Sequence, residues 1–226
     1  WSSDVCSSDL VVRKFFSTVH NTYRFFAQYA NVDGFDGSEK EIPVAERAVM
    51  DRWILSELNS LVALVRSCLD DYEPTKAMRA VTDFANDYLS NWYVHLTRER
   101  YWGSGMTADK LAAYQTLYTC LETLALLMAP AAPFYADRLF RDLNDVTGHN
   151  QAKSVHLAGF PECDDSLVDK ELETRMELAQ KITSMTLALR KRDNVKINVR
   201  KPLQRILIPV TEQLRAHLEP VRDLIR

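Results

Sequence analysis

Glycine and proline are both scarce in this chain of 226 residues, with 6 and 8 copies respectively. Average proteins use the two together at roughly twice that frequency. Because these residues mark turns and break helices, their scarcity disfavours a fold of many short strands joined by tight turns. The composition favours long helices, and the length is enough for one domain or two.

Paired cysteines and long apolar runs are also missing. The four cysteines are far apart and form no C-x-x-C motif: Cys6, Cys68, Cys120 and Cys163. This spacing argues against a disulfide framework or a zinc site and indicates a reducing compartment, so we expect a cytoplasmic protein. No apolar run approaches the roughly 18 residues of a membrane span, and no signal peptide pattern is present, so we expect no membrane partner.

The motifs of common catalytic sites are absent as well. None of the five histidines belongs to an H-E-x-x-H motif, and no Walker loop or G-x-S-x-G elbow occurs. Residues 103–108 fit G-x-G-x-x-A, but a dinucleotide site needs a preceding strand, and here a helical pattern precedes the motif. We therefore interpret 103–108 as a loop and expect no catalytic residue, no metal and no cofactor in this chain.

Apolar residues recur at helical spacing through most of the chain, which predicts a mainly α fold. The predicted helices cover residues 11–30 and begin near these positions: Asp51, Pro74, Ala108, Pro133 and Asp169. Asp51 is expected to cap the second helix, and Ser166 with Asp169 has the spacing of a capping box before the last. The stripes place Trp92 in the core and Phe134 inward, and Ser154–Leu157 is expected to be extended.

The chain divides into four expected parts. Residues 1–10 repeat Ser-Ser-Asp and resemble translated sequencing-adapter read-through, so we expect a non-native tail there. Residues 11–50 form a connection made of a helix and a loop, and 51–193 form a helical bundle. Residues 194–226 are expected to be a truncated small α/β piece, because Ile206–Val210 is a short apolar run of the β type.

Aromatic and arginine residues are concentrated in Asn91–Trp102, at the C-terminal end of a predicted helix. Aromatic side chains can stack on unpaired bases, and arginines can bond phosphates or base edges. Arginine is also favoured near a helix C-terminus for electrostatic reasons alone. The pattern therefore leaves two interpretations open: an RNA-binding helix end, or core aromatics beside a row of surface arginines.

Positive charge is concentrated in residues 181–205. Eight basic residues stand there against one acid, Asp193, which gives a local charge of +7 in a chain of net charge −3. Such a segment suits a phosphate backbone, while the chain as a whole has no attraction for nucleic acid. A solvated basic surface is the alternative.

The same regions resemble the anticodon-binding helical domain of the class I aminoacyl-tRNA synthetases. Five segments carry this resemblance: Asp51–Leu55, Tyr72–Lys76, Leu89–Val94, Arg98–Trp102 and Met128–Phe134. Two further segments resemble the isoleucyl branch: Ser154–Leu157 with the following Phe160-Pro161, and Val195–Leu203. Lys201 departs from the pattern, because many relatives carry glutamine there, and this adds charge. The resemblance covers about residues 11–226, and the joint order of the motifs carries it.

The resemblance implies a bundle that grips the tRNA anticodon stem-loop, followed by the start of a C-terminal junction domain. The parent enzyme would join isoleucine to its tRNA with ATP and Mg. Its catalytic and editing domains would precede residue 11, so this fragment should be inactive alone. The implied tRNA-binding residues are Arg98, Arg100, Trp102, Arg190, Lys191, Arg192, Lys196, Arg200 and Lys201.

Other functions remain to be weighed beside this one. The nearest alternative is the equivalent part of a valyl-tRNA synthetase. A helical adaptor that binds protein through an aromatic surface belongs to a different class of function. A complete small enzyme is disfavoured by the missing site motifs.

Overall fold

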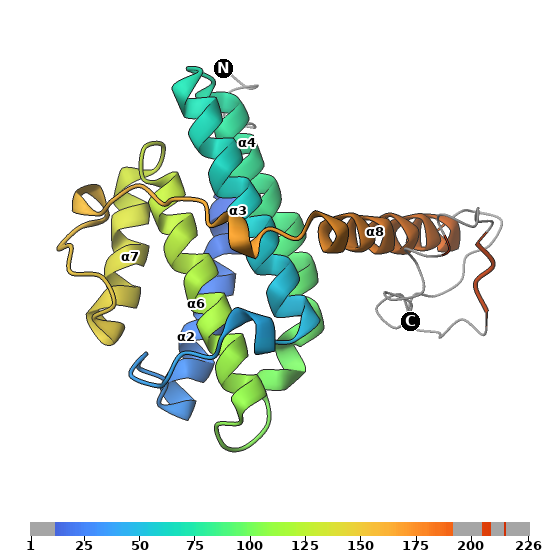
Figure 1. Ribbon diagram of the computed structural model, residues 1–226, viewed down its shortest axis with the longest axis horizontal. Coiled ribbons are helices and arrows are strands. Elements are labelled where there is room, and N and C mark those ends of the chain that lie inside the picture. The colour runs from blue at the N-terminus through green and yellow to red at the C-terminus, as the bar shows by residue number, and fades with distance from the viewer. Residues whose placement is uncertain (1–11, 192–204, 209–214, 216–226) are drawn as a thin grey trace. The chain divides into compact units, whose positions relative to one another are not determined.

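The computed structural model describes residues 12–191, 205–208 and 215. The chain divides into two compact units between Val168 and Asp169. Among the described residues the regular elements are all helical, which confirms the prediction of a mainly α fold (Figure 1). No helix in this part of the chain is both long enough and apolar enough to cross a membrane.

The first unit is a bundle of long helices joined by short turns of 3-10 helix. Its α-helices are α2 (Ser17–Asp33), α3 (Val49–Asp70), α4 (Pro74–Asp83), α5 (His95–Thr97), α6 (Ala108–Met128) and α7 (Pro133–Thr147). Two π-helical segments accompany them, η1 (Val12–Phe16) and η3 (Phe84–Val94). The 3-10 turns are η2 (Val44–Glu46), η4 (Arg98–Tyr101), η5 (Val155–Leu157) and η6 (Asp165–Leu167).

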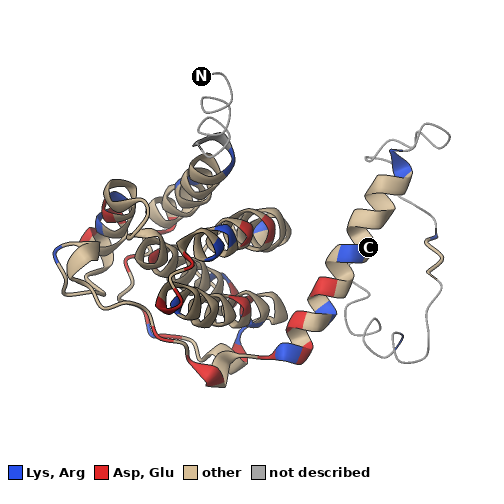
Figure 2. Ribbon diagram, turned by 90° about the horizontal axis from the view of Figure 1, so that it is seen from above, with Lys and Arg blue, Asp and Glu red and all other residues tan. Residues whose placement is uncertain are grey.

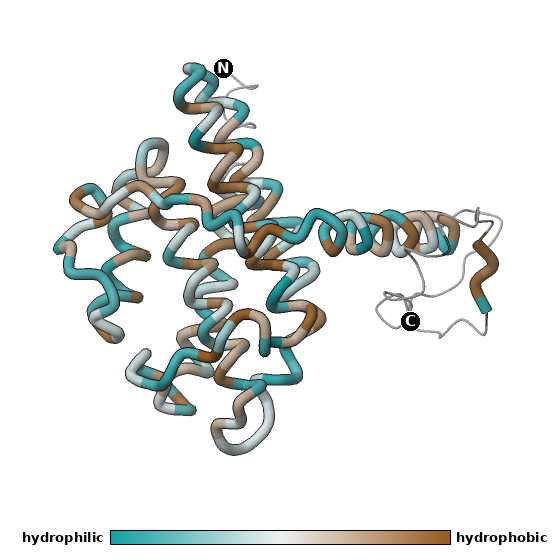
Figure 3. The backbone as a smooth tube through the Cα atoms, viewed as in Figure 1, coloured by the Kyte–Doolittle hydropathy of each residue, from teal (hydrophilic) through white to brown (hydrophobic). Residues whose placement is uncertain are grey.

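Helix α6 lies at the centre of the bundle. It packs against α2, α3, α4 and α7, and in Figure 1 it runs between α3 and α7. Its apolar residues lie on nearly all sides, including Ala113, Leu117, Leu121 and Leu127, which are all fully buried. A helix that is apolar all round must be covered on all sides. Figure 3 shows hydrophobic and hydrophilic residues alternating along the helices.

Helix α2 is part of this bundle rather than a separate connection. It contacts α6 and η3, and buries Val19, Thr22, Phe26 and Ala30. The expected division at residue 51 therefore does not separate two units. Gly34 ends α2 in the left-handed conformation, with φ of 72°, and its N–H bonds the carbonyl of Ala30.

The third predicted helix is wound less tightly than an α-helix. It runs without a break from Pro74 to Tyr101, and Phe84–Val94 within it is π-helical. Its buried residues include Phe84 and, beside it, a row that recurs at every fourth position: Ala77, Val81, Ala85, Leu89, Tyr93, Thr97 and Tyr101. In α-helix, a step of four residues overshoots a full turn by about 40°, and the wider π winding cancels this drift. The core position is consequently filled by Tyr93, fully buried, and not by Trp92, which is half-buried.

Two predicted helix caps are wrong, although both helices begin within two residues of the predicted positions. Helix α3 begins at Val49, so Asp51 lies inside its first turn, fully buried and not a cap. Helix α8 (Lys170–Arg190) is capped by Asp169, whose side chain accepts from the backbone N–H of Leu172. Ser166 instead donates its hydroxyl to Asp164 and belongs to the preceding η6 turn.

Two other local predictions are corrected near α7. Phe134 does not point inward, since 91% of it is exposed on the first turn of the helix. Residues 154–157 are not an extended piece, because Val155–Leu157 forms a 3-10 turn. The carboxylate of Asp137 accepts from both the Ser154 hydroxyl and the Val155 N–H, which holds this turn against α7.

Helix α8 belongs to the second unit, so the first unit ends at Val168. The expected bundle bounds of 51–193 stay a prediction. Residues 205–208 have no regular secondary structure, so the described part of the expected β run at Ile206–Val210 is not a strand. The remaining residues of the expected α/β piece, and the expected tail at residues 1–10, lie outside the described ranges.

Candidate nucleic-acid interface

The sequence-predicted aromatic and arginine cluster forms the end of the long π-containing helix and the 3-10 turn η4. Arg98 and Trp102 are exposed there, Trp102 to 54%. The guanidinium carbon of Arg98 lies 5.6 Å from the centre of a Trp102 ring, a cation–π contact. The two side chains together offer a flat aromatic surface and a cation at one exposed point.

Tyr101 anchors this turn in the core between the two exposed residues. It is 1% exposed, and its hydroxyl donates to the carbonyl of Ala113 on α6 at 3.0 Å. Its ring makes edge contacts with Phe25 and Tyr114, at centre-to-centre distances of 5.1 and 5.0 Å. Burial raises the pKa of the Tyr101 phenol well above its ordinary value, so the hydroxyl stays protonated and remains a donor.

Arg100 points inward and is bound by two aspartates. Its two terminal nitrogens each donate at 2.8 Å to one oxygen of the buried Asp51, in the bidentate arrangement. Its Nε donates to Asp109 at 2.8 Å, and Nη2 also reaches the Asp109 backbone carbonyl. Burial disfavours the charged form, but the two carboxylates outweigh it and raise the pKa of Arg100 above its ordinary value. The geometry thus favours a structural role for Arg100.

The loop of residues 102–107, which carries Trp102, has a second anchor that was not predicted from the sequence. Lys110, on the first turn of α6, is 2% exposed. Its Nζ donates to the Gly103 carbonyl at 2.8 Å and pairs with Asp33, the last residue of α2. Burial would raise the pKa of Asp33, but hydrogen bonds from Lys110 and Tyr114 lower it. Helical spacing alone provides no signal for this pair, because its members are distant in sequence.

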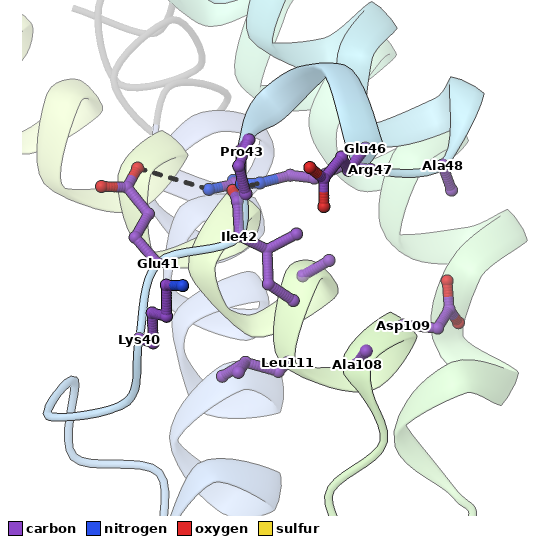
Figure 4. A pocket seen from close by; sticks show the side chains of 11 residues that line it. Lys40, Glu41, Ile42, Pro43, Glu46, Arg47, Ala48, Ala108, Asp109 and Leu111 are labelled. Atoms are coloured by element: carbon purple, nitrogen blue, oxygen red, sulfur yellow. Dashed lines mark hydrogen bonds and ion pairs between the residues drawn. The ribbon is translucent and has the colours of Figure 1, made fainter.

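A cavity of about 470 Å³ lies beside α6, between its first turns and the loop that precedes α3 (Figure 4). Arg47 crosses its wall at 6% exposure, with Nε donating to the Ile42 carbonyl and Nη1 to Thr116. Glu41 pairs with the same guanidinium at 3.5 Å. These bonds hold the loop against α6, which is a structural role. They do not form a catalytic arrangement of acid, base and nucleophile.

The predicted basic segment is only partly described. Arg190 is the last residue of α8 and is half-buried, and Lys191, which follows it, is exposed. Figure 2 shows acidic and basic residues mixed along the first part of α8, where Glu177 pairs with Lys181 at 2.7 Å. Lys181 is therefore balanced locally. Four predicted contacts lie outside the described residues: Arg192, Lys196, Arg200 and Lys201.

Within residues 12–191, 205–208 and 215, no group of histidine, cysteine and acidic side chains could hold a metal ion. Cys68 and Cys120 are buried free thiols, and Cys163 bonds Asp165. Burial raises the pKa of Cys120, which keeps the thiol protonated.

Comparison with known families decides what kind of domain this is. The family model of the anticodon-binding domain of tRNA ligase matches residues 51–207. The chain belongs to this family. This anticodon-binding domain includes the Arg98–Trp102 turn. It also includes the two aspartates that bind Arg100, Asp51 on α3 and Asp109 on α6.

Several relatives of this anticodon-binding domain are isoleucine–tRNA ligases. That of Bacteroides fragilis is 60% identical over 223 residues, which are 98% of this chain and 19% of the relative. The ligase of Bacteroides thetaiotaomicron is 58% identical over the same shares. The ligase of Dehalococcoides mccartyi is 46% identical over 198 residues, or 88% of this chain and 19% of the relative. The chain thus spans about a fifth of the length of these relatives.

Proposed function

We propose that this chain is the part of an isoleucine–tRNA ligase that binds the anticodon stem-loop of the tRNA for isoleucine. The family supports the anticodon loop as the ligand, and the relatives support isoleucine as the amino acid. The parent protein would join isoleucine to this tRNA in the cytoplasm, with ATP and Mg bound in a catalytic domain outside these 226 residues. That catalytic domain would be a partner of this one.

The exposed pair of Arg98 and Trp102 carries the proposal. Anticodon bases are unpaired, so they can be splayed out and stacked on an aromatic ring. Trp102 offers such a ring at 54% exposure, and the guanidinium of Arg98 lies against it. Because Arg98 can bond the edge of a base in a bidentate manner, it can read the base that Trp102 holds.

Arg100 contributes to this function indirectly. Its guanidinium is bound by Asp51 and Asp109, so its role is to fix the turn from which Arg98 and Trp102 project. Contact with RNA from this helix end is consequently assigned to Arg98 and Trp102. The contacts predicted at Arg190, Lys191 and the rest of the basic segment remain part of the proposal, as binders of the phosphate backbone.

Binding of synthetic anticodon stem-loops tests the proposal. We expect Trp102→Ala to weaken binding by about 1–3 kcal/mol with little dependence on sequence. We expect Arg98→Ala to reduce the preference for the isoleucine G-A-U triplet over a swapped triplet by about 1–3 kcal/mol. A stem-loop with the valine triplet separates the valyl alternative, because a valyl domain would prefer it.

The bundle offers a matched control variant. Arg66 also lies 5.6 Å from an aromatic ring, that of Phe160, and it is exposed. Arg66→Ala removes a similar cation–π pair elsewhere on the bundle, so it should leave stem-loop binding unchanged. If Arg66→Ala and Arg98→Ala weaken binding equally, the Arg98–Trp102 pair is not the recognition site. If stem-loop binding does not weaken as the salt concentration rises, the alternative of a helical adaptor that binds protein is favoured instead.

A further inference from the structure

The loop that carries Trp102 contains two glycines within three residues. Gly105 adopts a left-handed conformation with φ of 81°, and a Cβ at Gly103 or Gly105 would meet nothing within 4 Å. The backbone there is not confined by neighbouring atoms, and glycine has the largest conformational freedom of all residues. Trp102 is tied on its N-terminal side, where its N–H donates to the Glu99 carbonyl at 3.2 Å. The residues that follow Trp102 depend on contacts from outside the loop.

Lys110 makes two of these contacts, one at each end of the loop. Its backbone N–H donates to Oγ1 of Thr107, the cap of α6, at 3.1 Å. Its side chain reaches back and donates to the carbonyl of Gly103 at 2.8 Å. Asp33 pairs with the same ammonium group, and Tyr114 donates its hydroxyl to the same Asp33 oxygen at 2.5 Å. The loop is thereby joined to the end of α2 through one ion pair, in which Lys110 is buried and Asp33 is partly exposed.

Helix stability does not account for this arrangement. Lys110 is a cation near the N-terminus of α6 and Asp33 is an anion at the C-terminus of α2, and each is opposite to the sign that the helix dipole favours. Taking the two charges out of water adds a desolvation penalty that the pair must offset. What the pair does supply is a specific bond to the Gly103 carbonyl, next to Trp102.

We propose that Lys110 is a positioning residue for RNA recognition: its bond to the Gly103 carbonyl, held by Asp33, sets the loop in the conformation that presents Trp102. This inference rests on the proposed function. Stacking of a base on a Trp102 that is already positioned costs less conformational entropy than stacking that must first order the loop. Lys110 itself is buried and touches no RNA.

The test compares four variants of the 226-residue chain. Lys110→Met removes the anchor but leaves the Asp33 carboxylate without its cation. The double variant Asp33→Asn with Lys110→Met has no unpaired charge at this site, so it is less prone to misfold. Asn59→Ala is the matched control, because Asn59 is a buried residue that fixes a different connection by accepting from the Asp164 N–H at 2.9 Å. Adding Gly103→Ala to the double variant should partly restore binding, since alanine fits there and restricts the loop.

Two readouts are needed, one without RNA and one with it. Incorporated 5-fluorotryptophan gives a separate 19F NMR signal for Trp102, assigned by its disappearance in Trp102→Phe. In the double variant we expect this signal to shift or broaden, while the thermal unfolding transition stays cooperative. We expect stem-loop affinity to fall about threefold to tenfold. The salt dependence should stay unchanged, because neither substitution removes a group that binds phosphate.

The outcomes separate this inference from the proposed function. An unchanged 19F signal and unchanged affinity in the double variant would overturn the positioning role. An equal loss of affinity in Asn59→Ala would also overturn it, because the effect would then be one of general stability. If Trp102→Ala binds RNA as well as the wild type does, the proposed function fails at this site. A 19F change in the double variant would then still show that Lys110 positions the loop.

Discussion

The hydroxyl of Tyr93 donates to Oδ1 of Asp51 at 2.6 Å, and Arg100 bonds both oxygens of the same carboxylate. Asp51 and Tyr93 are both fully buried, and the carboxylate accepts three hydrogen bonds from two side chains, Tyr93 and Arg100, in the interior of the bundle. Burial raises the pKa of Tyr93, which keeps the phenol protonated as a donor. The start of α3 is thereby joined to the end of the helix that carries Arg98.

Removal of this carboxylate should destabilise the domain strongly. Asp51→Ala leaves the Tyr93 hydroxyl and one side of Arg100 without an acceptor, and removal of one partner of a buried pair costs about 3 kcal/mol or more. We expect the urea midpoint to fall accordingly. Asp109→Ala is the control on the other side of Arg100: because Asp109 is 59% exposed, its removal should cost about 0–1 kcal/mol. Equal effects would contradict the role given to Asp51.

Tyr72→Gly should stabilise the domain. Tyr72 has φ of 57° between α3 and α4 and is 93% exposed, so it occupies a left-handed conformation without packing in return. That conformation costs a side-chain-bearing residue about 1–2 kcal/mol, part of which glycine loses again to the entropy of the unfolded chain. We expect a net gain of about 0.5–1 kcal/mol by urea unfolding. A lower midpoint would show that the Tyr72 side chain makes a stabilising contact.

The stabilising effect of Asp33 should vanish in acid. Its pKa is lowered in the folded state, so its contribution is fully present above the unfolded value of about 3.9 and is lost as the pH falls through the folded value. Asp33→Asn should therefore be less stable than the wild type at pH 7, and the difference should shrink below about pH 4. The measurement is urea unfolding of both proteins across this range. A difference that stays constant with pH would mean that the ion pair with Lys110 contributes nothing.

Affinity for tRNA should depend on salt through the basic segment. Replacement of Arg190, Lys191 and Arg192 with alanine should weaken binding of all tRNAs alike. It should also flatten the log–log salt slope by about 0.7–0.9 for each phosphate that is no longer neutralised. Filter binding over a series of salt concentrations measures the slope. The matched control is Lys181→Ala, since Glu177 already pairs with Lys181. An unchanged slope in the triple variant would identify the segment as a solvated surface.

The chain should show no isoleucine-dependent pyrophosphate exchange on its own. It spans about a fifth of the length of its ligase relatives, its sequence contains no Walker loop, and its G-x-G-x-x-A match at residues 103–108 follows a helix and not a strand. Activity above a no-protein control, in a preparation free of host synthetase, would contradict this expectation.

Helix number and position could be predicted from the sequence because apolar spacing and proline placement are local signals. The starts of α6 at Ala108 and α7 at Pro133 agree with the prediction. The predicted core position of the third helix, Trp92, is wrong by one residue, because the prediction assumes α winding and the segment is π-helical. Helical period is a property of the backbone that side-chain pattern alone does not fix.

The candidate site was predictable in place but not in the roles of its residues. Arg98 and Arg100 are equivalent by composition, yet one is exposed and the other is bound by Asp51, which lies 49 positions away in sequence. Lys110 and Asp33 could not be predicted for the same reason. Pairings between distant positions depend on how helices pack, and a single sequence contains no local signal for them.

The number of residues in the π-helical stretch sets the direction in which the proposed recognition residues project. Every residue from Arg98 to Trp102 projects at an angle set by the turns counted through Phe84–Val94. Deletion of one residue from that stretch, at unchanged winding, would rotate the later residues by roughly 80–100° around the helix axis. Tyr93 would then turn away from Asp51, and Arg98 away from its present direction. Substitutions there change individual side chains, whereas a deletion would redirect the whole tip, so this segment should tolerate changes of side chain far better than changes of length.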